Sequence, residues 1–270
     1  MNRERDLPEA DVARAGSSRP SHGSKLTAIV IAVVVMISVL LALHSSDEPC
    51  ATGFRREGPR CFAIVPVEIP DHDVVAVPEM TVMVGPSDWE AEGRVRPRTV
   101  HVDAFSIDRY EFTAGQLCKA RRRLCNEDAN RAAYGVAFDE ARALCNERGG
   151  RLPSEDEWLA AAGGEKPRRY PWGDTGAVCR RAAWRIENGP CASGATGPDT
   201  VGAHPDGVTP LGLHDLAGNV AEWVDSTPPS VRGGSWKTNL ATELRTWPKT
   251  EMPPVGDATT GFRCAYGAVR

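Results

Sequence analysis

One uncharged, apolar run of the chain, residues 26–43, is long enough to cross a bilayer, and it decides how the rest can be organised. A helix over this run, at about 1.5 Å per residue, would be about 27 Å long, close to the thickness of a bilayer core. Basic residues precede the run and acidic residues follow it: Arg14, Arg19 and Lys25, then Asp47 and Glu48. Because positive flanks stay in the cytoplasm, we predict a single-pass transmembrane signal-anchor at 26–43 with an extracytoplasmic C-terminal body.

The segments on either side complete this organisation. Residues 1–25 are polar, with several prolines, glycines and serines, which is typical of a disordered cytoplasmic tail. We predict a connecting segment at 44–73 and one periplasmic or extracellular domain at 74–270. The alternatives to an anchor are a cleaved signal peptide, a lipoprotein and a buried core helix. The long polar lead, the poor cleavage site at Ala42-Leu43-His44 and the residues before Cys50 disfavour them.

All eight cysteines follow the apolar run, which indicates disulfides formed in an oxidising compartment. An even set of this size allows many pairings, so spacing alone cannot choose among them. Three local pairs fit the spacing: Cys50–Cys61, Cys118–Cys125 and Cys179–Cys191. Zinc is the alternative, but the sequence has no Cys-x-x-Cys pair and no histidine close to a cysteine pair.

Short strands and capped helices are expected along the body. Strand composition or apolar–polar alternation marks 74–77, 80–84 and 100–107. Thr113-x-x-Gln116 and Ser154-x-x-Glu157 are capping boxes, which predict helices that run to about residues 120 and 162. A third helix, 138–148, has an apolar face and stops at Gly149-Gly150. Recurrent glycine and proline predict irregular structure from about 175 to 210.

Five short runs occur in order along this body: Tyr110-Glu111-Phe112-Thr113, the run 151–158, Tyr170-Pro171-Trp172-Gly173-Asp174, the run 212–223, and 232–236 closed by 261–265. In this order they resemble the signature of the formylglycine-generating enzyme, or sulfatase-modifying factor, family over about 74–269. The resemblance implies an α+β, C-type-lectin-like fold that is rich in irregular loops. It also implies a disulfide between Cys145 and Cys264 that ties the central helix to the last strand.

The resemblance argues against the family's best-known chemistry. The family's oxidases hold copper with two cysteines just after the Gly-Gly-Ser run, and the matching positions are Thr238 and Glu243. Because soft Cu(I) needs thiolates, we expect no copper. The wider family includes non-haem iron sulfoxide synthases, but no His-x-x-x-His pair is present for a 2-His-1-carboxylate site. The histidines of the body are His72, His101, His204 and His214, and we interpret Asp71-His72-Asp73 as a solvated loop.

Calcium is the metal that the resemblance does imply. It places ligands at Asp215, at the carbonyls of Gly218 and Val220, and at Glu222. Two carboxylates and two backbone oxygens in one short loop suit a hard cation, although four ligands leave its shell incomplete. The alternative is that Asp215 caps the turn and Glu222 forms a salt bridge. A second calcium site of the family lacks a ligand, since Ala183 stands where asparagine is expected.

A ligand groove is implied by the same resemblance. Its members here are Ser235, Trp236, Thr238, Glu243, Arg245 and Trp247. An arginine and a glutamate among tryptophans could recognise a peptide or a glycan, and ordinary surface is the alternative. The remaining tryptophans of the family runs are expected in the core: Trp158, Trp172 and Trp223.

The net charge of −4 does not indicate a nucleic-acid-binding surface. We therefore predict a membrane-anchored, extracytoplasmic domain that is not a formylglycine-generating oxidase. It would act as a recognition or scaffold module for an envelope peptide, protein or glycan. The alternative is an atypical metal-dependent oxidase of the formylglycine-generating and non-haem iron enzyme superfamily. A third possibility is a purely structural partner of another envelope protein.

Overall fold

The computed structural model describes Met36 and residues 54–57, 60–63, 72–84, 97–125, 128–166, 168–189 and 191–267. The chain divides into two compact units, Met1–Pro49 and Cys50–Arg270, and the elements below belong to the second. Within the described ranges, no helix combines the length and the apolar character needed to cross a bilayer. The predicted tail, the anchor at 26–43 (Met36 apart), Cys50 and the side chain of Cys61 lie outside what the structure describes.

Three helices occur in the described ranges: α3 (Ala114–Ala120), α4 (Phe138–Glu147) and α5 (Glu155–Gly163). Both predicted capping boxes form. The Thr113 hydroxyl accepts from the Gln116 amide at 3.2 Å, and the Gln116 side chain accepts from the Thr113 amide at 2.9 Å. Ser154 and Glu157 repeat this exchange at the start of α5, so local sequence alone sets where these two helices begin.

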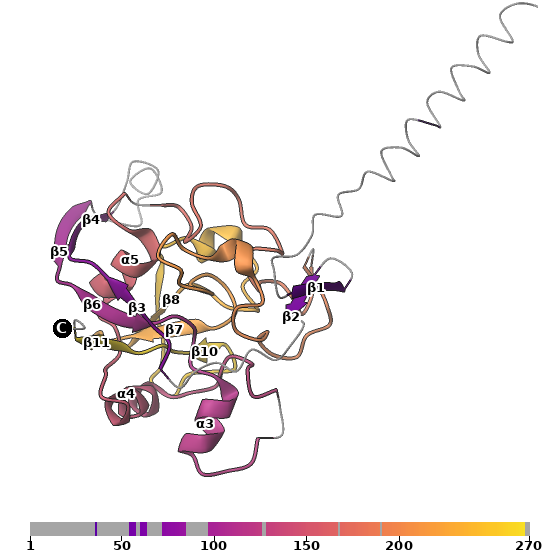
Figure 1. Ribbon diagram of the computed structural model, residues 1–270, viewed down its shortest axis with the longest axis horizontal. Coiled ribbons are helices and arrows are strands. Elements are labelled where there is room, and N and C mark those ends of the chain that lie inside the picture. Colours follow the sequence, from indigo (N-terminus) through magenta and orange to yellow (C-terminus); the bar gives the residue numbers. More distant parts are fainter. Residues whose placement is uncertain are drawn as a thin grey trace, which may run out of the picture. The chain divides into compact units, whose positions relative to one another are not determined.

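The strands form several small sheets (Figure 1). One sheet has the order β10 (Thr260–Gly261), β7 (Ala221–Val224), β8 (Ser230–Arg232) and β9 (Lys249–Glu251). A second has the order β11 (Ala265–Gly267), β6 (Phe105–Asp108) and β3 (Val74–Val77), and is antiparallel. The remaining strands form antiparallel pairs: β4 (Met80–Val84) with β5 (Arg98–Val102), and β1 (Phe54–Glu57) with β2 (Arg60–Ala63).

The predicted strand 100–107 is two strands rather than one. β5 pairs with β4, whereas β6 lies between β3 and β11, so the chain changes sheet at Asp103-Ala104. All four residues of β6 are buried, because a central strand is covered on both faces. The alternation that indicated a single half-buried strand therefore describes only its first half.

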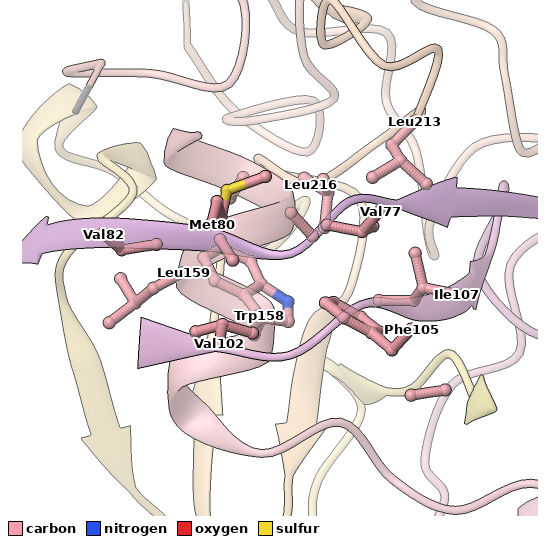
Figure 2. Packing of buried hydrophobic residues seen from close by; sticks show 14 of the residues in the cluster. Val77, Met80, Val82, Val102, Phe105, Ile107, Trp158, Leu159, Leu213 and Leu216 are labelled. Carbon is pink, nitrogen blue, oxygen red and sulfur yellow. The ribbon is translucent and has the colours of Figure 1, made fainter. Parts of the chain in front are cut away.

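Two of the hydrophobic clusters support the region in which the family runs meet. In one, α5 packs against β4 and β5 with Trp158 and Leu159 among the strand side chains (Figure 2). In the other, Phe112 stacks on Phe262 at 4.6 Å between ring centroids. Trp158 and Trp223 are 0% exposed, as predicted for core tryptophans. Trp172 is half-buried and stacks on Tyr170.

Three disulfides join the cysteines whose side chains are described: Cys118–Cys125, Cys145–Cys264 and Cys179–Cys191. All three were predicted, the second of them from the family resemblance. Cys145–Cys264 connects α4 to the residue directly before β11 and closes a sequence separation of 119 residues. Disulfides of this kind are typical of proteins that fold in an oxidising, extracytoplasmic compartment.

Candidate functional site

A buried ion pair lies where the two C-terminal sequence runs meet. The side chains of Glu222 in β7 and Arg263, just after β10, are 1% and 0% exposed. Arg263 donates from Nη2 to Oε1 of Glu222 at 2.6 Å, and from Nε to both carboxylate oxygens at 2.9 Å. Trp158 Nε1 donates to Oε2 at 2.8 Å. Protein donors thus occupy both oxygens of this carboxylate.

Arg263 also holds the surrounding backbone together. It donates to the carbonyls of Asp108 and Arg109 at 3.2 and 3.0 Å, and to the carbonyl of His214 at 2.7 Å. Burial acts to lower the pKa of Arg263, but the Glu222 carboxylate outweighs burial and the pKa is raised. The charged guanidinium therefore joins the end of β6 to the loop that precedes β7.

Glu111 forms the second buried acidic contact with this loop. Its carboxyl oxygens accept from Asn219 Nδ2 at 2.5 Å and from the Val220 amide at 3.0 Å. Burial raises the pKa of Glu111 well above its usual range, and the carboxylates of Asp215 and Glu222 act in the same direction. A buried acid that accepts from one side-chain amide and one backbone amide therefore fixes the loop from the side of the first family-like run, 110–113.

The loop itself follows a tight left-handed path. Asp215, Gly218 and Asn219 have φ values of 57°, 81° and 57°. At Gly218 an added Cβ would lie 2.4 Å from the carbonyl oxygen of Ala183, so only glycine fits there. Oδ2 of Asp215 accepts from the Gly202 amide at 2.6 Å, so this carboxylate binds the backbone of a different segment, 13 residues before it, rather than its own turn.

The predicted calcium ligands are close in sequence, but their side chains already have protein partners. Glu222 forms the salt bridge with Arg263, and Asp215 caps the backbone at Gly202. Within the described residues, no group of three or more His, Cys, Asp or Glu side chains is arranged to hold a metal ion. Calcium at Asp215, Gly218, Val220 and Glu222 stays a prediction, and an arginine already lies against one of its two carboxylates.

The predicted groove residues divide into a buried and an accessible set. Trp236 and Trp247 are 2% and 5% exposed, so neither indole offers an open face to a ligand. Trp236 Nε1 donates to the Ala258 carbonyl at 3.1 Å, and the Trp247 carbonyl accepts from Arg232 at 3.0 Å. Ser235 is buried too, whereas Thr238 and Arg245 are half-buried and Glu243 is exposed.

No thiol stands at the two positions where the family's oxidases hold copper. The Thr238 hydroxyl accepts from the Ser235 amide at 2.8 Å, which closes a small turn. Glu243 lies in the short 3-10 helix η2 (Ala241–Leu244). Every cysteine whose side chain is described is in a disulfide.

The four histidines of the body have separate surroundings. His72 lies at the edge of Tyr266, and His101 is near Glu79 and Asp103 on the surface. Nε2 of His204 is 3.1 Å from Asp199, and His214 lies over Tyr110 with 4.8 Å between ring centroids. Burial lowers the pKa of His214.

Sequence reasoning gave no role to Glu111, Asn219 or Arg263, although all three lie inside the family-like runs. Their shared hydrogen-bond network forms only because the fold brings together segments more than a hundred residues apart in the chain. A charged residue inside a short run of buried apolar neighbours, such as Arg263 after Phe262, was the available signal, because charges are buried only with partners.

The fold is an α+β domain with many irregular loops. A buried Glu–Arg pair closes it and disulfides cross-link it, and these features define the class of protein. The chain belongs to the family described as sulfatase-modifying factor enzyme 1-like domain, which matches residues 65–268. The match begins before Val74, where we expected the domain to start.

Curated relatives include one named as inactive and one named as an oxygenase. The chain is 38% identical over 151 residues to inactive C-alpha-formylglycine-generating enzyme 2 of Bos taurus, covering 50% of each chain. It is 30% identical over 209 residues to hercynine oxygenase of Mycolicibacterium thermoresistibile, covering 69% of this chain and 41% of that relative. The chain thus spans half or less of the length of these relatives.

Solved structures support the fold. PvdO from Pseudomonas aeruginosa superposes with a TM-score of 0.58 at 20% identity, covering 72% of this chain and 94% of that one. Treponema denticola variable protein 1 superposes with a TM-score of 0.60 at 19% identity, with the same coverage. At these identities the likeness concerns the fold alone.

Proposed function

We propose that this chain is a membrane-anchored, extracytoplasmic domain that recognises or scaffolds an envelope component and does not generate formylglycine. The observation that supports this most is the chemistry at the copper positions. A threonine hydroxyl and an exposed carboxylate replace two thiolates, and neither is a ligand that Cu(I) prefers. The likeness to a relative named as inactive agrees with this proposal.

The disulfides and the apolar run support the proposed extracytoplasmic, membrane-anchored location. Three disulfides in the described domain agree with folding outside the cytoplasm. The uncharged run 26–43, with basic residues before it and acidic ones after it, supports a single anchor oriented in the same way. We propose that the chain crosses the membrane once at 26–43 and that the disulfide-bonded domain lies outside the cytoplasm.

The recognition surface that we propose is the loop 237–245. Leu240 is 59% exposed, Glu243 is exposed and Arg245 is half-buried, so apolar and charged groups lie together on one short segment. The buried rings of Trp236 and Trp247 flank this loop and hold its two ends in the core. A rigid loop that presents a carboxylate and an apolar side chain suits an envelope peptide, protein or glycan.

The oxidase question is tested with the full chain, produced under oxidising conditions and extracted in detergent without chelator. We expect no stoichiometric copper by elemental analysis, and no oxidation of a cysteine peptide when Cu(I) is supplied. A family member that carries both copper-binding cysteines is the positive control. Stoichiometric copper together with peptide oxidation would overturn the proposal.

The recognition role is tested on peptide and glycan arrays. Glu243→Lys or Leu240→Asn should reduce the signal on any spot that the unaltered chain binds by about tenfold, a loss typical of interface residues. Glu251→Lys, an exposed glutamate on β9, is the matched control for charge. Binding that survives both loop variants would rule out this loop as the recognition surface.

The likeness to a hercynine oxygenase over 69% of the chain favours one alternative, a metal-dependent oxidase on the same fold. The same elemental analysis decides it. Stoichiometric iron would favour the oxidase, because the recognition proposal requires no redox metal.

A further inference from the structure

An exposed segment with four cations spans the last two residues of α3 and the loop that follows it. The six residues between Cys118 and Cys125 are Lys119, Ala120, Arg121, Arg122, Arg123 and Leu124, and all six are exposed. We call residues 119–124 the cationic loop. The Cys118–Cys125 disulfide closes the segment at its base, and the segment lies at the C-terminal end of α3 (Figure 1).

The end of α3 holds an arginine where a glycine is favoured. The Arg123 amide donates to the Cys118 carbonyl at 2.9 Å and the Arg122 amide to the Lys119 carbonyl at 3.1 Å, which is the hydrogen-bond pattern of a Schellman C-cap. In that motif the residue after the cap is left-handed, and Arg122 has φ 52°. A non-glycine residue is strained in this conformation, so local backbone preference does not account for an arginine at position 122.

The arginines of the loop differ in whether a carboxylate pairs with them. Arg121 is bound by Glu140, with Nε–Oε1 and Nη2–Oε2 distances of 2.7 Å. The described residues give neither Arg122 nor Arg123 a side-chain salt bridge, and both side chains are exposed. The dipole of α3 favours cations near its C-terminus, but this effect does not call for an arginine in the left-handed position.

The exposed side chain of Leu124 helps to distinguish which kind of anionic partner the loop suits. Its side chain is 89% exposed, the largest value among the exposed large apolar residues of the described chain. Nucleic acids and sulfated glycans reward positive charge and offer little to an exposed leucine. A bilayer surface with anionic lipids rewards both, because cations bind the headgroups while the apolar side chain enters the interface.

We infer that the cationic loop docks the domain onto an anionic phospholipid surface. This inference rests on the proposed membrane anchor, which would keep the domain close to a bilayer. Tethering raises the effective concentration of the loop at the membrane to about the millimolar range, so a weak interaction suffices. The chain carries a net charge of −4, so docking through this loop also selects which face of the domain meets the lipid.

The test uses the full chain reconstituted into nanodiscs of phosphatidylcholine alone or mixed with phosphatidylglycerol. Trypsin cleavage within the loop is measured by mass spectrometry and compared with cleavage after Lys237, an exposed lysine of another loop. Each cation near an anionic surface contributes about 1 kcal/mol, so we expect loop cleavage to be at least about tenfold slower in the anionic discs. At about 1 M salt, where the Debye length is about 3 Å, this protection should disappear.

Arg122→Gly separates docking from folding. Glycine suits the left-handed position, so this variant should unfold at a higher temperature than the unaltered chain. It should nevertheless lose about fivefold of the lipid-dependent protection, the equivalent of one charge. Arg142→Gln, an exposed arginine on α4, is the matched control and should leave protection unchanged.

Leu124→Asn tests the apolar contribution and should reduce protection several-fold, whereas Leu240→Asn should not. Equal cleavage of the loop in both kinds of nanodisc would overturn the inference while leaving the anchor intact. Loss of the full chain from the discs would overturn the proposed anchor and, with it, this inference.

Discussion

Arg263 lies against both carboxylate oxygens of Glu222, with the two residues 41 positions apart in sequence and both side chains withdrawn from solvent. The pair joins β7 to the segment after β10, and Arg263 extends the link to the end of β6. It is the contact on which the surrounding loop geometry depends, because two other parts of the backbone share the same guanidinium.

Removing one partner of this pair should be costly. Arg263→Met and Glu222→Gln should each lower the free energy of unfolding by about 3 to 5 kcal/mol, because each leaves a buried polar group without its partner. The double variant should lose less free energy of unfolding than the sum of the losses of the two single variants. Urea unfolding measures all three, and Arg142→Met, which breaks an exposed pair with Asp139, should change stability by less than about 1 kcal/mol.

The disulfides should differ in their contribution according to the loop that each closes. Replacing Cys145 and Cys264 by alanine, at a separation of 119 residues, should cost about 5 kcal/mol in the chain-entropy estimate. Replacing Cys118 and Cys125, at a separation of 7, should cost about 2 kcal/mol. Chemical unfolding of the two double variants gives the comparison, and equal losses would contradict it.

Glu157 should make stability depend on pH in the acid range. Burial acts to raise the pKa of Glu157, but hydrogen bonds from Arg151 and from the Ser154 amide outweigh it and lower the pKa below its usual value. The ionised carboxylate therefore stabilises the fold above the usual pKa of about 4.5, and this contribution is lost as the pH falls through the lower folded pKa. Glu157→Gln should cost about 1 kcal/mol at neutral pH.

The difference between Glu157→Gln and the unaltered chain should narrow below about pH 4.5, where both side chains approach neutrality. Thermal unfolding across the acid range measures the narrowing. Arg151→Gln should show the same trend, since it removes the other half of the interaction. A constant difference at every pH would show that ionisation of Glu157 does not contribute to stability.

Gly218 should not accept a side chain, even a small one. A Cβ at Gly218 would lie 2.4 Å from the Ala183 carbonyl oxygen, whereas at Gly149, which has a similar φ of 75°, nothing lies within 4 Å. Gly149→Ala should therefore cost about 1 to 2 kcal/mol from backbone strain alone. Gly218→Ala should cost clearly more, and equal losses in urea unfolding would show that the loop adjusts.

Thermal unfolding tests the calcium ligands that the family resemblance implies. Calcium bound at Asp215 and Glu222 should raise the unfolding temperature of the full chain, and the rise should be lost in Asp215→Asn. An unfolding temperature that neither calcium nor a chelator changes would leave Glu222 as the partner of Arg263 alone.

Local signals predicted the parts of the fold that short stretches control. The helix starts at Thr113 and Ser154 follow from capping chemistry within four residues. The two local disulfides join pairs that fitted the spacing, although spacing alone could not choose them. The division of 100–107 into two strands could not be predicted, because it depends on which sheets flank each half.

The site was predictable only in outline. Family-like runs located the loop around Gly218, but they gave no sign that Arg263 would meet Glu222 or that Glu111 would bind Asn219. Trp236 was expected beside a ligand and is buried instead, since its indole reaches Ala258 across the fold. Such partners are set by tertiary packing, which no single run of residues contains.

The features that close the domain come last along the described chain. Arg263 completes the pair with Glu222, Cys264 bonds to α4, and β11 adds to the sheet beside β6. A growing chain that has not yet produced these residues carries an unpaired acid, a free thiol and an open strand edge. Closure of this domain therefore depends on residues 263–267, and a chain cut before Arg263 would leave Glu222, Cys145 and the edge of β6 without these partners.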